Sequence, residues 1–512
     1  MLHCKVDRAA AGRPAAALVP RVSRQQVRIV SFLQEQARLR QARQAENVQG
    51  KRVRQEILRP GIPPATPTNS FRVPDRPSPP LREDDKDGHY VYELGENLTS
   101  RYKILSKMGE GTFGRVLECW DRKHKDYVAI KIVRNIDKYR HAAMIELEVL
   151  NTLERNDPQG SKNCLSLREW FDYRGHVCMV FEKLGPSLFD FLRKNEYRPF
   201  PVDLVQDFAR QLVLAVSFMH ECKLVHTDLK PENILLVSLD YCRSTSVGAS
   251  GRASATRVVP SSSAIKVIDF GSATFEDQYH SSIVSTRHYR APEVIMGLGW
   301  SYPCDMWSVG CIIMELLTGD ALFQTHENLE HLAMMEQVLG PLPEPMVGRA
   351  NKLATKYFVK NKLCWPDGAA NKKSVKAVKK LSNIRRLILE HGDSSAVPYL
   401  DTLVDLIQGM LRYDPDTRIS AAQAMQHPFF SLKLAQSIPP AMPSPNILAP
   451  GQQAAGTDGC RVVVATAVQQ AQSISGATPS VAPGLSTGLP LLVTAGRGSV
   501  AAGGGLGAGM GW

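Results

Sequence analysis

The pattern of apolar and polar positions divides the chain into a strand-rich part followed by a helix-rich part. Between residues 102 and 181 short apolar runs typical of strands dominate, and the clearest of them covers 128–133. One helical pattern, at 142–153, interrupts these strands. From 186 to 430 the helical period dominates, except at 238–264, where Ser, Thr, Gly and Arg predict a flexible surface insertion.

Composition and charge add two tails to this central region. Residues 1–80 contain 15 Lys and Arg against 5 Asp and Glu, whereas 81–433 contain 45 and 44, so the net charge of +12 belongs mostly to an N-terminal arm. Prolines are frequent at 60–85, and Ala, Gly, Ser, Pro and Val dominate after 434. We therefore predict disordered tails at 1–89 and 431–512 around an ordered region at 90–430.

The start of the chain leaves two interpretations open. It is rich in Ala and Arg and poor in acidic residues, which fits a basic disordered arm or an organelle transit peptide. No apolar run reaches the roughly 18 residues that a membrane-spanning helix needs, so we expect no membrane association.

A glycine-rich stretch follows the first predicted strand. Gly109, Gly111 and Gly114 lie in the order G-x-G-x-x-G, with Val116 two residues further on. Glycine lets backbone N–H groups approach a phosphate closely. The same spacing marks dinucleotide-binding folds, but here a second strand follows instead of a helix, which favours a phosphate-covering hairpin. A Gly-rich turn without function is the alternative.

Lys131 ends the run Val-Ala-Ile-Lys within the otherwise apolar strand at 128–133, where an ammonium group needs an anionic partner. The helix at 142–153 offers Glu146 and Glu148. With about 100° per residue, Glu146 shares a face with the apolar positions of that helix, and Glu148 points about 200° away. We therefore predict an ion pair between Lys131 and Glu146, with Glu148 facing water.

The segment 226–233, His-Thr-Asp-Leu-Lys-Pro-Glu-Asn, combines several groups that phosphoryl transfer requires. Asp228 can accept or orient the proton of an attacking hydroxyl. Lys230 can offset the charge of the transferring phosphoryl group, and the amide oxygen of Asn233 suits Mg²⁺. Asp269, at the end of a buried strand, is a second candidate ligand for Mg²⁺.

These motifs occur in the order of the protein kinase signature, which ends here with Ala-Pro-Glu at 291–293. Residues 90–430 accordingly resemble eukaryotic protein kinases, and Glu-His-Leu-Ala-Met-Met-Glu at 330–336 resembles the motif that names the LAMMER, or cdc-like, kinases of the plant and green-algal type. That motif itself reads as a helix with a Leu/Met core face.

The resemblance implies an α+β bilobal fold, with a small antiparallel N-lobe at 90–182 and a mainly helical C-lobe at 183–430. It also implies a dual-specificity, ATP- and Mg²⁺-dependent kinase that phosphorylates Ser/Arg-rich splicing factors, autophosphorylates on Tyr as well, and works in the nucleus, with the cytoplasm as a second location.

The resemblance assigns further residues to ATP. Phe181 becomes the gatekeeper, and Glu182 and Leu184 present hinge backbone groups to adenine. The ring lies among Val116, Ala129 and Leu235. The phosphate-covering residues are Met108, Gly109, Glu110, Gly111, Thr112, Phe113, Gly114, Arg115 and Val116. Asp305 is expected to brace the catalytic loop, and Arg418 to pair with Glu293.

Thr227 departs from the general kinase pattern, in which an Arg at this place binds an activating phosphate. We therefore hypothesise a catalytic loop that is ordered without such a phosphate. A pseudokinase scaffold is the alternative function, and a nucleic-acid-binding protein with an incidental kinase fold is a third. The basic arm fits an import receptor and leaves direct nucleic-acid binding open. We expect a monomer.

Overall fold

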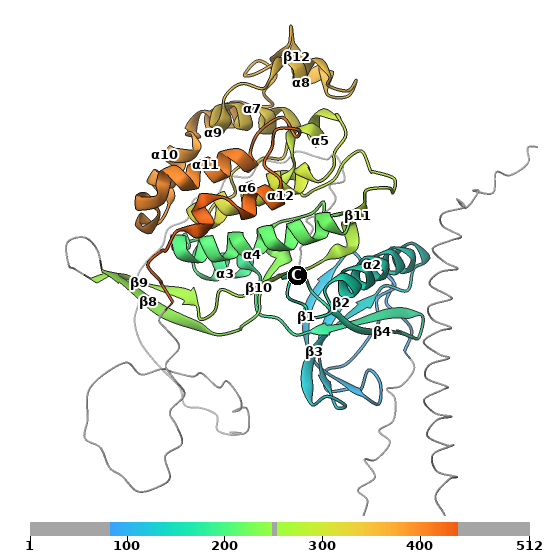
Figure 1. Cartoon of the computed structure of the whole chain (residues 1–512). Coiled ribbons are helices and arrows are strands. Elements are labelled where there is room, and N and C mark those ends of the chain that lie inside the picture. The colour runs from blue at the N-terminus through green and yellow to red at the C-terminus, as the bar shows by residue number, and fades with distance from the viewer. Residues whose placement is uncertain (1–81, 248–252, 439–512) are drawn as a thin grey trace, which may run out of the picture. The chain divides into compact units, whose positions relative to one another are not determined.

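The computed structural model describes residues 82–247 and 253–438 (Figure 1). The predicted basic arm, most of the Pro-rich segment and nearly all of the C-terminal low-complexity region lie outside these residues. No helix within the two described ranges is both long enough and apolar enough to cross a bilayer.

A five-stranded antiparallel sheet, in the order β1-β2-β3-β5-β4, forms the N-lobe. Its strands are β1 (Tyr102–Gly111), β2 (Gly114–Asp121), β3 (Asp126–Val133), β4 (Leu167–Tyr173) and β5 (His176–Glu182). A single long helix, α2 (Asp137–Asn156), follows β3. The predicted strand and helix are therefore present, and both extend beyond the ranges that the apolar pattern predicts.

From Val128 to Val133 the β3 strand is apolar except for Lys131, because both of its faces are covered there. Side chains alternate between the two faces of a strand. Val128, Ile130 and Ile132 enter one apolar cluster, whereas Ala129 and Val133 enter the larger cluster that α2 helps to form. Lys131 belongs to this second face, which places its ammonium group on the side of the catalytic residues.

A segment that precedes β1 packs on the outer face of the sheet, and we call residues 82–98 the strap. Tyr90 and Leu98 are buried in the outer cluster with the first strands. Asp84 lies 2.9 Å from Nε2 of the fully buried His176, whose Nδ1 donates to the carbonyl of Val133. The contacts of the strap therefore begin before Tyr90, where the predicted ordered region starts. Acidic residues of the strap contact polar groups of the sheet, and the apolar pattern does not reveal these contacts.

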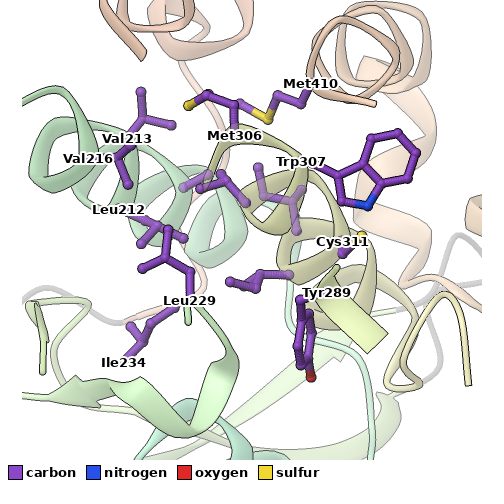
Figure 2. Packing of buried hydrophobic residues seen from close by; sticks show 14 of the residues in the cluster. Leu212, Val213, Val216, Leu229, Ile234, Tyr289, Met306, Trp307, Cys311 and Met410 are labelled. Carbon is purple, nitrogen blue, oxygen red and sulfur yellow. The ribbon is translucent and has the colours of Figure 1, made fainter. Parts of the chain in front are cut away.

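Two long helices, α4 (Val202–Glu221) and α6 (Pro303–Thr318), form the centre of the C-lobe. Figure 2 shows Leu212, Val213 and Val216 of α4 in the same apolar core as Met306 and Trp307 of α6. The surrounding helices are α3 (Leu188–Lys194), α5 (Pro292–Met296), α7 (Asn328–Leu339), α8 (Glu344–Gly348), α9 (Lys372–Lys380), α10 (Ile384–His391), α11 (Leu400–Met410) and α12 (Ala421–Met425).

Short antiparallel strand pairs complete the C-lobe and position its loops. The strand β6 pairs with β11, β7 with β10, and β12 with β13. Their bounds are β6 (Leu224–Val225), β7 (Ile234–Leu236), β10 (Ile265–Val267), β11 (Thr274–Phe275), β12 (Phe358–Val359) and β13 (Lys362–Leu363).

The insertion at 238–264 differs from its prediction. Instead of an irregular loop, β8 (Tyr241–Val247) and β9 (Ala253–Pro260) form an antiparallel ladder with Tyr241 opposite Pro260. Small and polar residues dominate both strands, so apolar periodicity gives no signal for them. Backbone hydrogen bonds, which do not depend on side-chain type, hold such a ladder together.

Candidate active site

The glycine-rich stretch forms the hairpin between β1 and β2, with Gly111 opposite Gly114 in the ladder. A Cβ atom on Gly114 would lie 2.2 Å from the carbonyl oxygen of Ile132, so only glycine allows this approach of β2 to β3. The side chain of Glu110 pairs with Lys107 and Arg115. Hydrogen bonds from Lys107 first, and then from Arg115, lower the pKa of Glu110 to about 2.

The strap also holds this hairpin next to its turn, at Arg115. Arg115 donates to the carboxylate of Asp85 at 2.9 Å and to the carbonyl of Tyr90 at 3.0 Å. Near the tip, Phe113 meets Tyr139 of α2 edge to face, with ring centroids 5.7 Å apart. The phosphate-covering hairpin is thus fixed from outside the sheet and from α2.

Lys131 forms the predicted ion pair with Glu146, with Nζ at 2.7 and 2.9 Å from the two carboxylate oxygens. Asp269 lies 3.7 Å from the same ammonium group. Burial lowers the pKa of Lys131, but Glu146 and Asp269 outweigh burial and raise it, so the ammonium stays charged. The geometry joins β3, α2 and the segment after β10 at one point.

Glu148 does not face water as its angular position predicts. It is half-buried, its Oε2 has no hydrogen-bond partner among the described residues, and burial raises its pKa. The helical period identifies the face that packs on the sheet. It gives no signal for Asp277 of the later segment, whose charge also raises the pKa of Glu148.

The catalytic loop at 226–233 is held by buried groups on both sides. Asp305, at the start of α6, accepts hydrogen bonds from the backbone N–H groups of His226 at 2.8 Å and Thr227 at 2.9 Å, as expected for a brace. Leu229 points into the C-lobe core near Ile234 (Figure 2). Because Leu229 is buried, its polar neighbours Asp228 and Lys230 are kept at the edge of the core.

Asp228 is surrounded by donors. Its Oδ2 accepts from Lys230 Nζ at 2.8 Å, and its Oδ1 accepts from both the backbone N–H and the hydroxyl of Thr286. Burial alone would raise the pKa of Asp228, but the charge of Lys230 and the hydrogen bonds from Lys230 and Thr286 outweigh it and lower the pKa. The carboxylate is therefore ionised and fixed in orientation.

Thr227 has φ of 68°, which is rare for a β-branched residue. Its hydroxyl donates to the carbonyl of Ser272 at 2.8 Å, three residues after Asp269. A direct hydrogen bond therefore joins the catalytic loop to the activation segment, by which we mean residues 272–290. The general kinase pattern makes this connection through Arg and a phosphate.

Asn233 and Asp269 offer oxygen ligands that fit Mg²⁺. Asn233 Nδ2 donates to the carbonyl of Asp228 at 3.0 Å, which leaves Oδ1 buried and without a partner among the described residues. The N–H of Ile268 donates to the carbonyl of Asn233 at 2.9 Å, so Asp269 follows directly beside it. Mg²⁺ usually takes one or two protein oxygens and completes its shell with phosphate and water.

The residues assigned to adenine come from both lobes. Phe181 lies opposite Ala129 in the ladder of β3 and β5, and Val116 lies opposite Lys131. Leu184 and Leu235 share a small apolar cluster with Ile268. The hinge approaches β7 closely at Gly185, whose N–H donates to the carbonyl of Leu236 and where a Cβ would lie 2.4 Å from the oxygen of Ser238. The side chain of Glu182 pairs with Lys266.

Glu232 also lies inside the catalytic loop, although the motifs of the sequence assign it no role. Its Oε2 is buried without a hydrogen-bond partner among the described residues. Burial raises its pKa, Lys230 lowers it, and Asp228 and Asp190 raise it further. A buried carboxylate with one oxygen left without a partner, beside the catalytic residues, fits a cationic ligand. Its position in the sequence, two residues after Lys230, is the signal from which a role for Glu232 can be predicted.

Two buried pairs support the end of the activation segment. Arg418 makes the expected bidentate pair with Glu293, at 2.7 and 2.8 Å. Tyr289 donates from its hydroxyl to Glu315 of α6 at 2.7 Å. The 330–336 motif lies within α7 and is mostly buried. The hydroxyl of Thr325 donates to the buried carboxylate of Glu330 at 2.7 Å, so the polar end of the motif has a partner. The motif has the core role that its apolar pattern predicts.

Comparison with known proteins gives the same assignment as this geometry. Residues 102–430 match the protein kinase domain family. The serine/threonine-protein kinase AFC1 of Arabidopsis thaliana is 60% identical over 379 residues, which cover 73% of this chain and 80% of that protein. The dual specificity protein kinase CLK2 of Homo sapiens is 47% identical over 350 residues, with 68% of each chain covered.

The chain belongs to the LAMMER, or cdc-like, protein kinases. A solved kinase domain, PF14_0431, aligns with a TM-score of 0.62 and 39% identity over 68% of this chain and 100% of its own. The bilobal α+β fold is therefore confirmed, and this LAMMER kinase is an ATP-dependent protein kinase. The family assignment favours an enzyme over a scaffold.

Proposed function

We propose that this LAMMER kinase phosphorylates Ser and Thr of Ser/Arg-rich splicing factors, autophosphorylates on Tyr as well, and regulates pre-mRNA splicing in the nucleus. The observation that carries the substrate class is Glu232. Its buried Oε2, which has no hydrogen-bond partner in the part of the chain that the structure describes, lies in the loop that holds Asp228. A planar guanidinium satisfies a carboxylate with parallel N–H bonds, so an Arg next to the acceptor serine fits this position.

The phosphoryl transfer follows from the positions of the side chains. The substrate hydroxyl loses its proton to Asp228 as its oxygen forms a bond to the γ-phosphorus, and the bond from that phosphorus to the ADP oxygen breaks. Lys230 offsets the charge on the transferring group. Lys131, fixed by Glu146, contacts the phosphates that remain on ADP, and the hairpin at 108–116 covers them.

Mg²⁺ would be held by Asn233 and Asp269 and would neutralise charge on the phosphates. On the adenine side, Glu182 and Leu184 supply backbone groups of the hinge. Phe181 limits the depth of the site, and Val116, Ala129 and Leu235 enclose the ring. Dual specificity and an active monomer are parts of the same proposal, and the relative from Homo sapiens carries dual specificity in its name.

The decisive experiment uses two substitutions and two peptides. Asp228→Asn should abolish phosphorylation of a Ser/Arg-repeat peptide while Mg·ATP still binds, because the proton acceptor is lost and the nucleotide contacts remain. Glu232→Gln should raise the KM for the Ser/Arg-repeat peptide by about tenfold or more and leave an Arg-free peptide unaffected. An equal effect of Glu232→Gln on both peptides would refute the assigned substrate class. Failure of the unmodified chain to bind Mg·ATP would favour the scaffold.

Localisation rests on the basic arm, which lies outside the described residues. We propose that an import receptor binds this arm through its excess of Arg and Lys. A fluorescent fusion of the full chain should accumulate in the nucleus, and removal of residues 1–80 should abolish the accumulation. Retention of RNA by the full chain and not by the shortened one would instead support nucleic-acid binding by the arm.

A further inference from the structure

A strongly basic segment lies between α8 and α10, far along the chain from the catalytic loop. Residues 349–380, here called the lysine-rich insertion, contain Arg349 and nine lysines but one acidic residue, Asp367. The rest of 81–433 contains 35 basic and 43 acidic residues. The near-neutral balance of the folded region therefore hides a cationic insertion on an otherwise acidic domain.

The lysines of this insertion contribute no ion pairs to the described part of the fold. All nine are exposed, and none forms an ion pair with another residue in 82–247 or 253–438. By contrast, Arg386 just beyond the insertion pairs with Glu390, and Lys183 pairs with Glu118. The nine residues are Lys352, Lys356, Lys360, Lys362, Lys372, Lys373, Lys376, Lys379 and Lys380.

Five of these lysines lie on α9 and share one face. Ser374 and Val378 are the buried positions of this helix. At about 100° per residue, the five lysines occupy an arc of about 120° on the side opposite the buried positions. The helix thus presents a row of ammonium groups to the outside and attaches to the lobe through a narrow apolar edge.

Hydrogen bonds connect the other end of the insertion to the catalytic site. Thr286 contacts Asp228, and the next residue, Arg287, donates to Asn328 Oδ1 at 2.7 Å. Asn328 in turn donates to the hydroxyl of Tyr357 at 3.2 Å. The Tyr357 ring lies 5.3 Å from the Nζ of its neighbour Lys356. The hairpin of β12 and β13 is therefore close to the place where a protein substrate must lie.

The insertion is also fixed against the elements around it. The backbone N–H of Asn351 donates to the carbonyl of Met296, at the end of α5. Both β13 and α9 pack against α7, beside which Figure 1 shows β12 and α8. A fixed scaffold with many unpaired ammonium groups fits a ligand that carries several negative charges.

We propose that the lysine-rich insertion binds phosphoserines of a substrate that has already been partly phosphorylated. This inference rests on the proposed function, since it concerns the same Ser/Arg-rich class. Each phosphate adds a charge of about −1.5 to −2, so phosphorylation converts a cationic Ser/Arg repeat into a chain that the lysines attract. Glu232 would take an Arg, while the insertion takes phosphates made in earlier turns.

A phosphopeptide fits this surface better than a nucleic acid does. Binding of single-stranded nucleic acid combines a basic groove with exposed aromatic rings on which bases stack. The aromatic residues of the insertion, Tyr357, Phe358 and Trp365, are half-buried and pack against the lobe. The connection to Thr286 also places the insertion beside a protein substrate.

Binding of the full chain to labelled peptides, without ATP, tests the proposal. The probes are a Ser/Arg-repeat peptide with several phosphoserines, the same peptide unphosphorylated, an Arg-free peptide with the same phosphoserines, and a single-stranded RNA. The test variant replaces the five lysines of α9 by Gln. The matched control variant replaces five exposed lysines elsewhere, which are Lys86, Lys123, Lys125, Lys138 and Lys194.

The α9 variant should bind both phosphopeptides about tenfold or more weakly, whereas the control variant should match the unmodified chain. The kcat/KM of the α9 variant for the unphosphorylated peptide should not fall. A second variant replaces Lys356, Lys360 and Lys362 by Gln. It leaves α9 untouched and should also weaken phosphopeptide binding. Unchanged binding in both variants would overturn the proposal, and a loss confined to RNA would assign the surface to nucleic acid.

The same measurements separate this inference from the proposed function. Binding of the Arg-free phosphopeptide does not depend on the Ser/Arg substrate class. Weaker binding of this peptide by the α9 variant therefore supports phosphoserine binding by the insertion, even if the unmodified chain fails to phosphorylate the Ser/Arg-repeat peptide. If the unmodified chain phosphorylates that peptide efficiently and the α9 variant binds the phosphopeptides unchanged, the proposed function stands and phosphoserine binding by the insertion is refuted.

Discussion

Thr286 donates twice to one oxygen of Asp228, from its backbone N–H at 2.8 Å and from its hydroxyl at 2.7 Å. The same hydroxyl lies 3.3 Å from Lys230 Nζ. The orientation of the proposed proton acceptor therefore depends on a residue of the activation segment, 58 positions further along the chain.

Removal of the Thr286 hydroxyl should lower the catalytic rate. Thr286→Val keeps the backbone hydrogen bond and the side-chain shape, so we expect kcat to fall by about tenfold to a hundredfold through misplacement of Asp228. Thr286→Ser keeps the hydroxyl and should retain most of the rate. Steady-state kinetics with a Ser/Arg-repeat peptide measures both, and full activity of Thr286→Val would contradict the positioning role.

The Thr227 contact predicts a kinase that works without an activating phosphate. The hydroxyl of Thr227 already joins the catalytic loop to Ser272. Phosphatase-treated full chain should therefore keep about half of its rate or more, and Thr227→Val should lose more than the treatment does. The hypothesis fails if treated enzyme is nearly inactive and recovers only when the segment 272–290 is phosphorylated.

Phosphosite mapping on the same samples adds a specific expectation. The candidate hydroxyls of the activation segment are Tyr279, Ser281, Ser282, Ser285, Thr286 and Tyr289. Tyr279 is 89% exposed, whereas Tyr289 is buried with its hydroxyl bound to Glu315. Tyrosine phosphorylation should therefore appear at Tyr279 and not at Tyr289.

Glu146 and Glu148 provide a matched pair of substitutions on one helix. Glu146→Gln breaks the buried pair with Lys131, and the loss of one partner of such a pair costs about 3–5 kcal/mol of unfolding free energy. We also expect kcat/KM for ATP to fall by about tenfold or more. Glu148→Gln removes a carboxylate with an unpaired Oε2 and should leave both quantities near the unmodified values. Chemical denaturation and ATP kinetics measure the two effects.

Glu315 should make stability depend on pH. Burial raises its pKa to about 7, against the opposing hydrogen bond from Tyr289. A carboxyl group whose pKa is higher in the folded state binds more protons folded than unfolded, so its contribution to stability declines as pH rises from about 4.5 to about 7. Glu315→Gln removes this decline and still accepts from Tyr289.

The difference in unfolding free energy between Glu315→Gln and the unmodified chain isolates this group, because other titrations cancel. The variant should gain stability relative to the unmodified chain across that interval, by up to about 3 kcal/mol at pH 8. A difference that does not change between pH 5 and pH 8 would show that the carboxyl is not protonated in the folded protein.

Local patterns in the sequence carry most of the fold and much of the site. The strand around Lys131 and the buried face of α2 follow from periodicity, and they predict the Lys131–Glu146 pair. The order of motifs predicts the bilobal fold, and the family resemblance predicts the Arg418–Glu293 pair. Lys131 and Arg418 carry charges that are expensive to bury alone, so an acidic partner can be predicted for each.

Other features depend on contacts that no local pattern encodes. Thr286 reaches Asp228 only because the activation segment folds back, and Asp277 of the same segment comes close enough to raise the pKa of Glu148. The ladder of β8 and β9 is made by backbone groups of polar residues. Glu232 was visible in the catalytic loop, but its unpaired oxygen becomes evident only once its neighbours are placed.

The strap changes what counts as the smallest fragment of this kinase that can be produced intact. The family match begins at residue 102, after the strap has ended. A fragment cut there would expose the outer apolar cluster, remove Asp84 from the buried His176, and release Arg115 beside the turn of the phosphate-covering hairpin. Loss of these residues, although they contribute no catalytic group, would weaken the sheet and the nucleotide site together.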